Sequence, residues 1–218
     1  MDSLHACIAL IPLAIYSLLL GTINISKRPF LTTGGRDLAA LGVAISGMII
    51  AGPMELFLPE RAVIILGPYA WLLPVGLFAL CVTFLVLVRR PRLVIYNLDS
   101  KQLRPILAEV AFRLDEHVRW AGDGLILPNV GVQLHLEPFG IMRGVQLISS
   151  GPQQSYDGWQ RLETALAADL RKVTVGFNPG AISQLVLAGG TLTALAIWLV
   201  LGQQDLRHAV EEMLRIGP

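Results

Sequence analysis

Four long runs of apolar residues divide the chain. They share a near absence of charge, since Glu55 is the only Lys, Arg, Asp or Glu within them, and they span residues 5–26, 38–58, 62–88 and 181–201. A helix needs about 20 apolar residues to cross roughly 30 Å of hydrocarbon. Buried helices of soluble domains are usually shorter and carry a polar stripe. The pattern therefore predicts four transmembrane helices.

The pattern changes abruptly between the third and fourth runs. Residues 89–179 hold 11 of the 17 basic and 9 of the 16 acidic residues, and their short apolar stretches alternate with turn residues. We therefore expect three domains along the chain. Residues 1–88 form the first three membrane helices, residues 89–179 form a cytosolic domain, and residues 180–218 form the fourth helix followed by an amphipathic tail.

The cytosolic domain shows both helical and strand periodicity. A β-branched segment predicts a strand at residues 92–97, and Val132–Glu137 alternates as a half-buried strand does. Residues 103–114 have helical spacing, and Asp99-Ser100 offers a helix cap before them. Because Pro105 is tolerated only in a first turn, we expect the helix to begin near Arg104 rather than at this cap. Three or four strands then precede a second helix capped by Ser155 or Asp157.

This order of elements predicts the fold class. Successive strands pair as hairpins, so the sheet should be mainly antiparallel, with two amphipathic helices on one face. The insert is then a small α+β domain, loosely ferredoxin-like, with the final strand missing or displaced. The whole chain is expected to be a membrane α-helical protein with four transmembrane helices and this inserted domain.

Composition agrees with a membrane protein. Hydrophobic residues make up 54% of the chain and charged residues 15%, and the mean hydropathy is +0.61. In ordinary soluble domains, about 45–50% of the residues are apolar and about 25% are charged. A net charge of +1 argues against nucleic-acid binding, and two cysteines exclude a disulfide scaffold or a cysteine-based zinc cluster.

Basic residues near the membrane predict the orientation. Eight of them flank the apolar runs on the side of the insert, namely Lys27, Arg28, Arg36, Arg89, Arg90, Arg92, Arg171 and Lys172. Three flank the runs on the other side, namely Arg61, Arg207 and Arg215. Positive residues favour the cytoplasmic side. We expect a bacterial inner (plasma) membrane, with the insert in the cytoplasm and both termini on the opposite side.

A polar sheet face is the candidate binding site. Alternation places Gln133, His135 and Glu137 on one side of their strand, and Arg119 lies in a second strand with the same alternation. If the strands are neighbours, these side chains form a face that binds a ligand or partner. The same face could be merely solvated, or it could hold a metal through His117, His135 and Glu137.

Motifs of known chemistry are absent from the sequence. There is no G-x-S-x-G, no G-x-x-x-x-G-K-[ST] and no G-x-G-x-x-G, and no His pair has a zinc-binding spacing. We therefore predict no catalytic residues, no cofactor and no metal, and we favour a binding protein over an enzyme.

Two features of the apolar runs suggest further roles. Glu55 is either solvated at the outer boundary, where it can pair with Arg61, or an intramembrane site between helices broken by Gly52-Pro53 and Gly67-Pro68. Small residues four apart let helices approach closely, within the bundle or in a homo-oligomer; they are Gly42, Ser46, Gly47, Ala51, Gly190 and Ala194.

Two functions follow from these features. The first is a membrane protein, with the lipid bilayer and a protein or a second copy as partners, whose cytosolic domain binds a partner or ligand as a scaffold, sensor or assembly factor. The alternative is a small transporter or membrane-embedded enzyme built around Glu55. The first is favoured because few polar residues lie at membrane depth.

Overall fold

The computed structural model describes residues 3–54, 56, 58, 65–138, 143–152 and 154–201. The chain forms two compact units, and each is described by itself. One unit holds most of the four long apolar helices. The other comprises residues 20–37 and 88–183 and holds the sheet.

Four helices are long and apolar enough to cross a membrane, judged by length and composition. They are α1 (Ser3–Ile25), α2 (Gly34–Ile49) with the π-helical segment η1 (Ile50–Met54), the 3-10 helix η2 (Gly67–Trp71) with α5 (Leu72–Val88), and α8 (Gly180–Leu201). All four predicted runs are therefore helical over most of their length. The two predicted breaks are also present, since Pro53 lies within η1 and Pro68 within η2.

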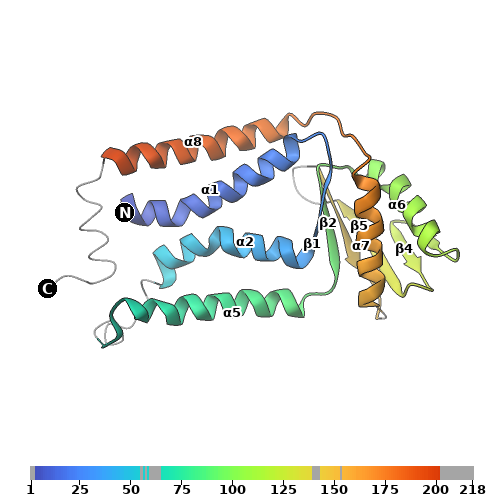
Figure 1. Ribbon diagram of the computed structural model, residues 1–218, viewed down its shortest axis with the longest axis horizontal. Helices are drawn as coiled ribbons and strands as arrows, with labels where there is room; N and C mark the ends of the chain where they lie inside the picture. Colours follow the sequence, from blue (N-terminus) through green and yellow to red (C-terminus); the bar gives the residue numbers. More distant parts are fainter. Residues whose placement is uncertain are drawn as a thin grey trace. The chain divides into compact units, whose positions relative to one another are not determined.

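Small residues bring the apolar helices into close contact within their unit. A Cβ atom added at Gly47 of α2 would lie 1.9 Å from the carbonyl oxygen of Ile8 in α1. One added at Gly42 would lie 2.9 Å from Val82 in α5. Figure 1 shows α2 beside both helices. Both glycines thus serve contacts within one chain, whereas Gly190 and Ala194 on α8 are exposed.

The second unit is built on one antiparallel sheet of six strands in the order β1-β2-β6-β5-β4-β3. Its strands are β1 (Phe30–Thr33), β2 (Arg92–Tyr96), β3 (Arg119–Ala121), β4 (Gly124–Leu127), β5 (Val132–Pro138) and β6 (Gly144–Ser149). The predicted antiparallel sheet is confirmed, and four strands lie between the two helices of the domain.

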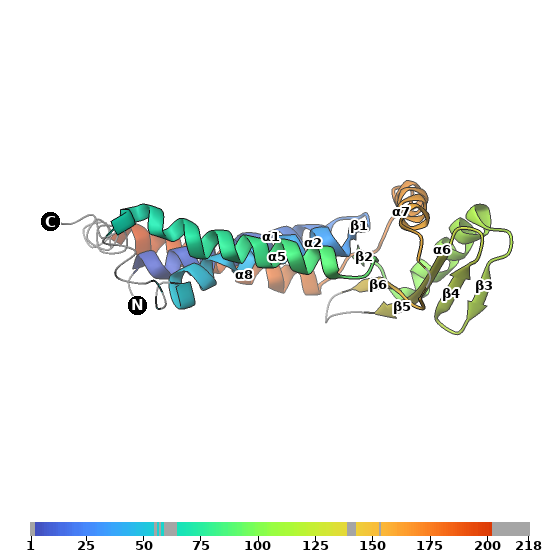
Figure 2. The ribbon, with the colours of Figure 1, turned by 90° about the horizontal axis from the view of Figure 1, so that it is seen from below.

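Two amphipathic helices, α6 (Ser100–Leu114) and α7 (Tyr156–Leu170), cover one face of this sheet (Figures 1 and 2). Leu107 of α6 and Leu162 of α7 are fully buried against Ile95, Leu134 and Leu147 of the sheet. Burial of one such side chain contributes about 1.5–3 kcal/mol. This single core holds the helices and strands together.

Strand β1 was not expected from the sequence. It comes from the connection between α1 and α2, and it pairs with β2 from Phe30 opposite Tyr96 to Thr33 opposite Leu93. Only four residues long, it lies between an exposed basic loop and the start of α2. The sheet unit therefore includes residues 20–37, which the sequence analysis assigned to the membrane helices and their connection.

The predicted start of α6 near Arg104 is wrong, because the helix begins at Ser100. A capping box forms there, in which the Gln102 side chain accepts a hydrogen bond from the Asp99 backbone N–H at 3.5 Å. Pro105 lies inside the helix and leaves one backbone hydrogen bond unmade. Pro105 and Lys101 are both exposed, so water can bind the carbonyl group that is left free.

Candidate functional site

The face of the sheet opposite α6 and α7 carries the predicted binding residues. In antiparallel strands, residues directly opposite each other share a face. Arg119 lies opposite Ile126, and Ile126 lies opposite Gln133. His135 and Glu137 follow Gln133 along β5 at every second position, so they point to the same side.

All four candidate residues therefore lie on one face, which we call the polar sheet face. Arg119, His135 and Glu137 are exposed and Gln133 is half-buried. The strands of Arg119 and His135 are not direct neighbours, because β4 lies between β3 and β5. Half-buried apolar and polar residues complete the face, namely Ile126, Gln146 and Ile148.

One end of this face is covered. Val94 and Tyr96 of β2 are buried although they lie on the same side as Glu137. The Tyr96 hydroxyl donates a hydrogen bond to the Asp37 carboxylate at 2.6 Å, and Arg92 lies 3.9 Å from the same carboxylate. The start of α2 thus covers the β2 end, and the strands β6 to β3 keep an accessible polar surface.

The chemistry of the polar sheet face suits recognition. Arg119 and Glu137 form no ion pair with any other residue that the structure describes, so both can form new hydrogen bonds. The described ranges contain no group of three His, Cys, Asp or Glu side chains that could hold a metal ion.

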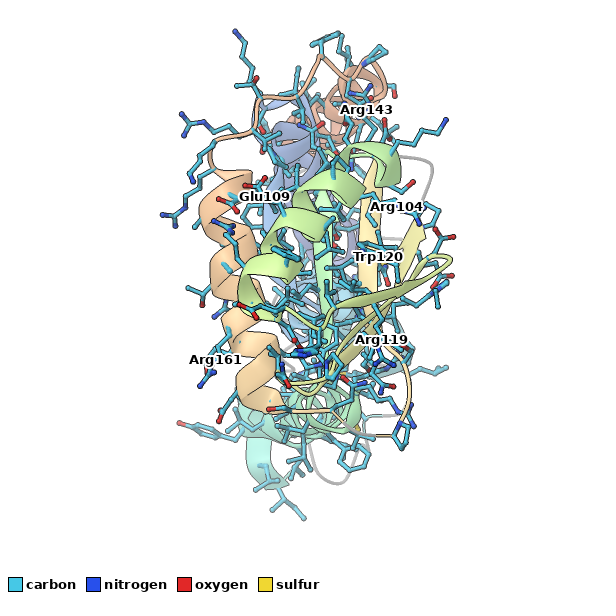
Figure 3. All side chains as sticks on the ribbon, turned by 90° about the vertical axis from the view of Figure 1, so that its right-hand side faces the viewer. Arg104, Glu109, Arg119, Trp120, Arg143 and Arg161 are labelled. Carbon is cyan, nitrogen blue, oxygen red and sulfur yellow. The ribbon has the colours of Figure 1, made fainter. Side chains whose placement is uncertain are left out.

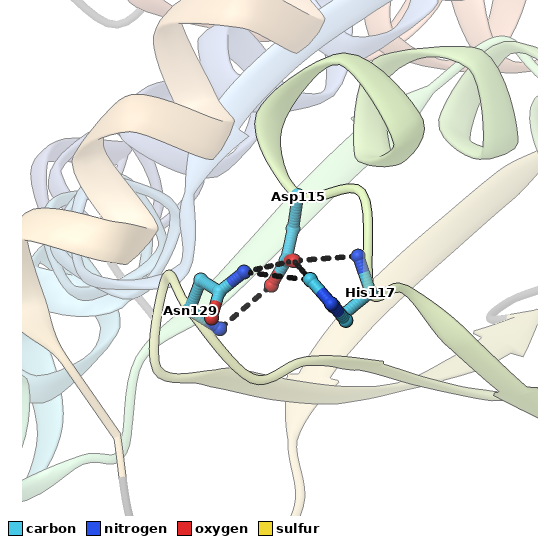
Figure 4. Close-up of polar contacts among 3 residues, drawn as sticks. All are labelled: Asp115, His117 and Asn129. Carbon is cyan, nitrogen blue, oxygen red and sulfur yellow. Dashed lines mark hydrogen bonds and ion pairs between the residues drawn. The ribbon is translucent and has the colours of Figure 1, made fainter.

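His117, which the sequence analysis considered as a metal ligand, lies in the turn before β3 and not in a strand of the sheet. It belongs to a cluster with Asp115 and Asn129 (Figure 4). The Asp115 carboxylate accepts hydrogen bonds from the backbone N–H of His117 at 2.9 Å and from Asn129 through its backbone N–H at 2.7 Å and its Nδ2 at 2.8 Å. Asn129 Nδ2 also lies 3.2 Å from His117 Nδ1.

This cluster fastens the end of α6 to the β4–β5 turn. The Asp115 side chain is inaccessible to solvent, and burial by itself raises its pKa. The hydrogen bonds from the backbone of His117, Asn129 and Val130 outweigh burial, so the pKa of Asp115 lies below its ordinary value of 3.8. Sequence reasoning missed this role, because Asn129, which supplies two of the hydrogen bonds, lies 14 residues away in the chain.

We expect Asp115→Asn to remove part of the acid sensitivity of the domain. A carboxyl whose pKa is lowered by folding stabilises the protein above its ordinary pKa, and this contribution is lost as the pH falls through the folded-state pKa. The variant should be less stable than the wild type at pH 7, and the difference should shrink below about pH 4. Urea unfolding of the full-length protein in detergent, followed by tryptophan fluorescence, measures this.

The matched control for this prediction is Glu116→Gln, which changes an exposed neighbouring carboxylate. Its stability should follow the wild type at every pH. A wild type and an Asp115→Asn variant that differ by the same amount at pH 7 and pH 3 would contradict the assignment.

Shallow, open cavities lie on the helix layer, and two of them are lined entirely by described residues. One, of about 370 Å³, is lined by Lys101, Arg104, Pro105, Ala108 and Trp120. Figure 3 shows Arg104 of α6 beside Trp120 of β3. The guanidinium lies 5.2 Å from the ring centre and donates a hydrogen bond to the Gly122 carbonyl at 2.7 Å.

Arg104 is therefore occupied in holding the β3–β4 turn to α6. The second cavity, of about 570 Å³, lies along α7 and includes Arg161 and Thr164. Both are open surfaces, unlike the enclosed pockets that bind small molecules. They do not compete with the polar sheet face as a candidate site.

Glu55, the second candidate site of the sequence analysis, lies outside the described residues. The helices on either side of it end irregularly, in η1 and η2. Comparison with protein-family models, with curated proteins and with solved structures finds no match for this chain.

Proposed function

We propose that this chain is an integral membrane protein whose α+β domain is a non-catalytic module that binds a partner through the polar sheet face. The observation that carries the proposal is a sheet with one face buried under two helices and the other face largely accessible and polar. Such a domain can act as a scaffold, sensor or assembly factor.

The apolar helices support the membrane assignment. α5 contains 17 residues without a charge, and none of its side chains is buried within the protein. Water would solvate such a surface poorly, whereas lipid hydrocarbon matches it. We place the domain in the cytoplasm of a bacterial cell, with both termini on the other side, on the strength of the basic residues at the helix ends.

The finer likeness to a ferredoxin-like fold stays a prediction. That fold has two strands between its helices, and this domain has four. The edge of the sheet beside β2 is occupied by β1, which precedes the domain in the chain.

A transporter or membrane-embedded enzyme around Glu55 is the second candidate. The π-helical turn at Pro53 and the 3-10 helix that begins at Gly67 favour it, because broken helices can line a site at membrane depth. The first proposal is preferred because the apolar runs hold few ionisable side chains.

Site-specific cross-linking in native membranes tests the binding face. A photoreactive amino acid at Gln146, on the polar sheet face, should give a discrete cross-linked product. The same probe at Glu109, on the outer surface of α6, should give none. The product should disappear when Arg119→Ala and His135→Ala are combined, because these substitutions remove two exposed hydrogen-bonding groups from the face that carries the probe.

The matched control is Arg161→Ala, which removes an exposed arginine from the helix layer. It should leave the cross-link intact. Absence of a product at Gln146, or a product that survives the double substitution, would count against the polar sheet face as the binding site.

A further inference from the structure

Two ends of the apolar helices meet the sheet within the same compact unit. The last turn of α1, which ends at Ile25, and the first turn of α8, which begins at Gly180, both belong to it. If the chain spans a membrane, as proposed above, the residues directly beyond these ends lie at the depth of the lipid headgroups. The inference below rests on that part of the proposed function.

Hydrogen bonds draw four segments together at this point, which we call the helix-end junction. The Lys27 carbonyl accepts a hydrogen bond from the Val175 backbone N–H at 2.9 Å. Arg143, from the connection between β5 and β6, donates to the next carbonyl along, that of Gly176, at 3.0 Å. The half-buried Arg143 side chain is thereby held at Gly176, four residues before α8 begins (Figure 3).

Asn97 links the same segments from the other side. Its φ of 61° places it in the left-handed region, which asparagine tolerates better than most residues. Its backbone N–H donates to the Arg143 carbonyl and its Nδ2 donates to the Ser26 carbonyl, both at 2.7 Å. Lys27 and Arg143 are therefore held close to each other by two independent connections.

The junction carries an excess of positive charge. Lys27 and Arg28 have exposed side chains, and neither forms an ion pair within the described part of the chain. Arg143 lies 3.6 Å from Asp99, whose side chain is half-exposed. Residues 26–29 and 173–180 contain no Asp or Glu, so three cations face one carboxylate.

A buried donor without a partner lies in the same junction. Asn178 is 8% exposed, and its Oδ1 accepts a hydrogen bond from the Gly180 backbone N–H at 3.2 Å, which sets the orientation of the amide. Its Nδ2 has no hydrogen-bond partner among the described residues. A buried donor left unsatisfied is costly, so an acceptor oxygen from a ligand would stabilise this site.

We propose that Lys27, Arg28, Arg143 and Asn178 form a site for the phosphate group of an anionic phospholipid. Arginine and lysine bind phosphate oxygens through charge-assisted hydrogen bonds, and basic residues beside membrane helices attract anionic lipids. The neighbouring Phe177 is 61% exposed and offers an apolar contact that suits a lipid better than a soluble phosphate.

Lipid binding to the full-length protein in detergent tests the proposal, with native mass spectrometry as the readout. Phosphatidylglycerol should bind more tightly than phosphatidylcholine. Combining Lys27→Gln and Arg28→Gln should weaken phosphatidylglycerol binding about 25-fold, since each cation near a membrane surface contributes about five-fold. These side chains make no hydrogen bond or ion pair in the described structure, so the variant should fold.

The control pair is Arg113→Gln with Arg161→Gln, two exposed arginines on the helix layer of the same domain. It should bind phosphatidylglycerol as the wild type does. Asn178→Ala should weaken binding without changing the charge. Equal binding of the two lipids, or an equal loss in both double variants, would overturn the proposal.

Two further measurements separate the alternatives. Millimolar inorganic phosphate should leave phosphatidylglycerol bound. Full displacement of the lipid by phosphate would assign the site to a soluble phosphate and overturn the proposal of a lipid site. A wash of the native membranes with alkaline carbonate tests the membrane assignment alone. A protein that remains in the washed membrane but shows no lipid preference would disprove only the headgroup site.

Discussion

Replacing Gly158 with alanine is expected to destabilise the α+β domain by about 1–3 kcal/mol. Gly158 lies in the first turn of α7, where a Cβ atom would meet the carbonyl oxygen of Val130 at 2.3 Å and Val132 Cγ2 at 2.8 Å. The first contact is with backbone, which cannot rotate away as a side chain does. The helix must therefore move off the sheet, with loss of contacts made by Trp159 and Leu162 in the core.

The sign of the change in stability distinguishes a steric clash at Gly158 from the intrinsic helix propensity of alanine. Alanine within a helix is normally favoured over glycine by about 1 kcal/mol, so an unconstrained site would be stabilised. Gly176→Ala provides the control, because no atom lies within 4 Å of its added Cβ and its φ is not in the positive region. Urea unfolding of both full-length variants should show a lower free energy of unfolding for Gly158→Ala alone. A neutral or stabilised Gly158→Ala would contradict the described packing of α7.

Periodicity explains why much of this fold could be predicted. The apolar runs have a length and purity that few structures other than membrane-length helices satisfy. In the domain, the alternation of Val132 to Glu137 reports a half-buried strand, and the structure confirms it as β5. Both signals are local, because each depends only on whether the residues of one element face water, lipid or the protein core.

Features that depend on distant residues could not be predicted in this way. Strand β1 is four residues long and is defined by its pairing with β2, more than fifty residues later. Its composition alone, Phe30 to Thr33, suits a loop as well as an edge strand. The start of α6 was misplaced for a different reason: the rule for Pro105 was given more weight than the cap at Asp99.

The candidate site was predicted in part. Alternation alone placed Gln133, His135 and Glu137 on one face, and the register adds Arg119 to it through β4. The inclusion of His117 with these residues failed because β3 begins only at Arg119, after a turn held by Asp115. The helix-end junction gave no local signal, because tertiary hydrogen bonds bring Arg143 to Lys27.

The second large effect is expected in a test of membrane topology, because each labelled site is either accessible from outside the cell or not. The proposed four-span arrangement would put the domain, which lies between the third and fourth helices in the chain, on the side of the membrane opposite the C-terminus. A cysteine at Tyr156, which is 79% exposed on α7, reports on the domain. A cysteine at Gly217, which lies outside the described residues, reports on the C-terminus.

Labelling these two sites tests the four-span arrangement most directly. Cys7 and Cys81 are free and would first be replaced by alanine. In intact cells, a membrane-impermeant maleimide should label the Gly217→Cys protein and leave the Tyr156→Cys protein unlabelled until the membrane is permeabilised. Labelling of both sites from the same side of the membrane would contradict the four-span arrangement.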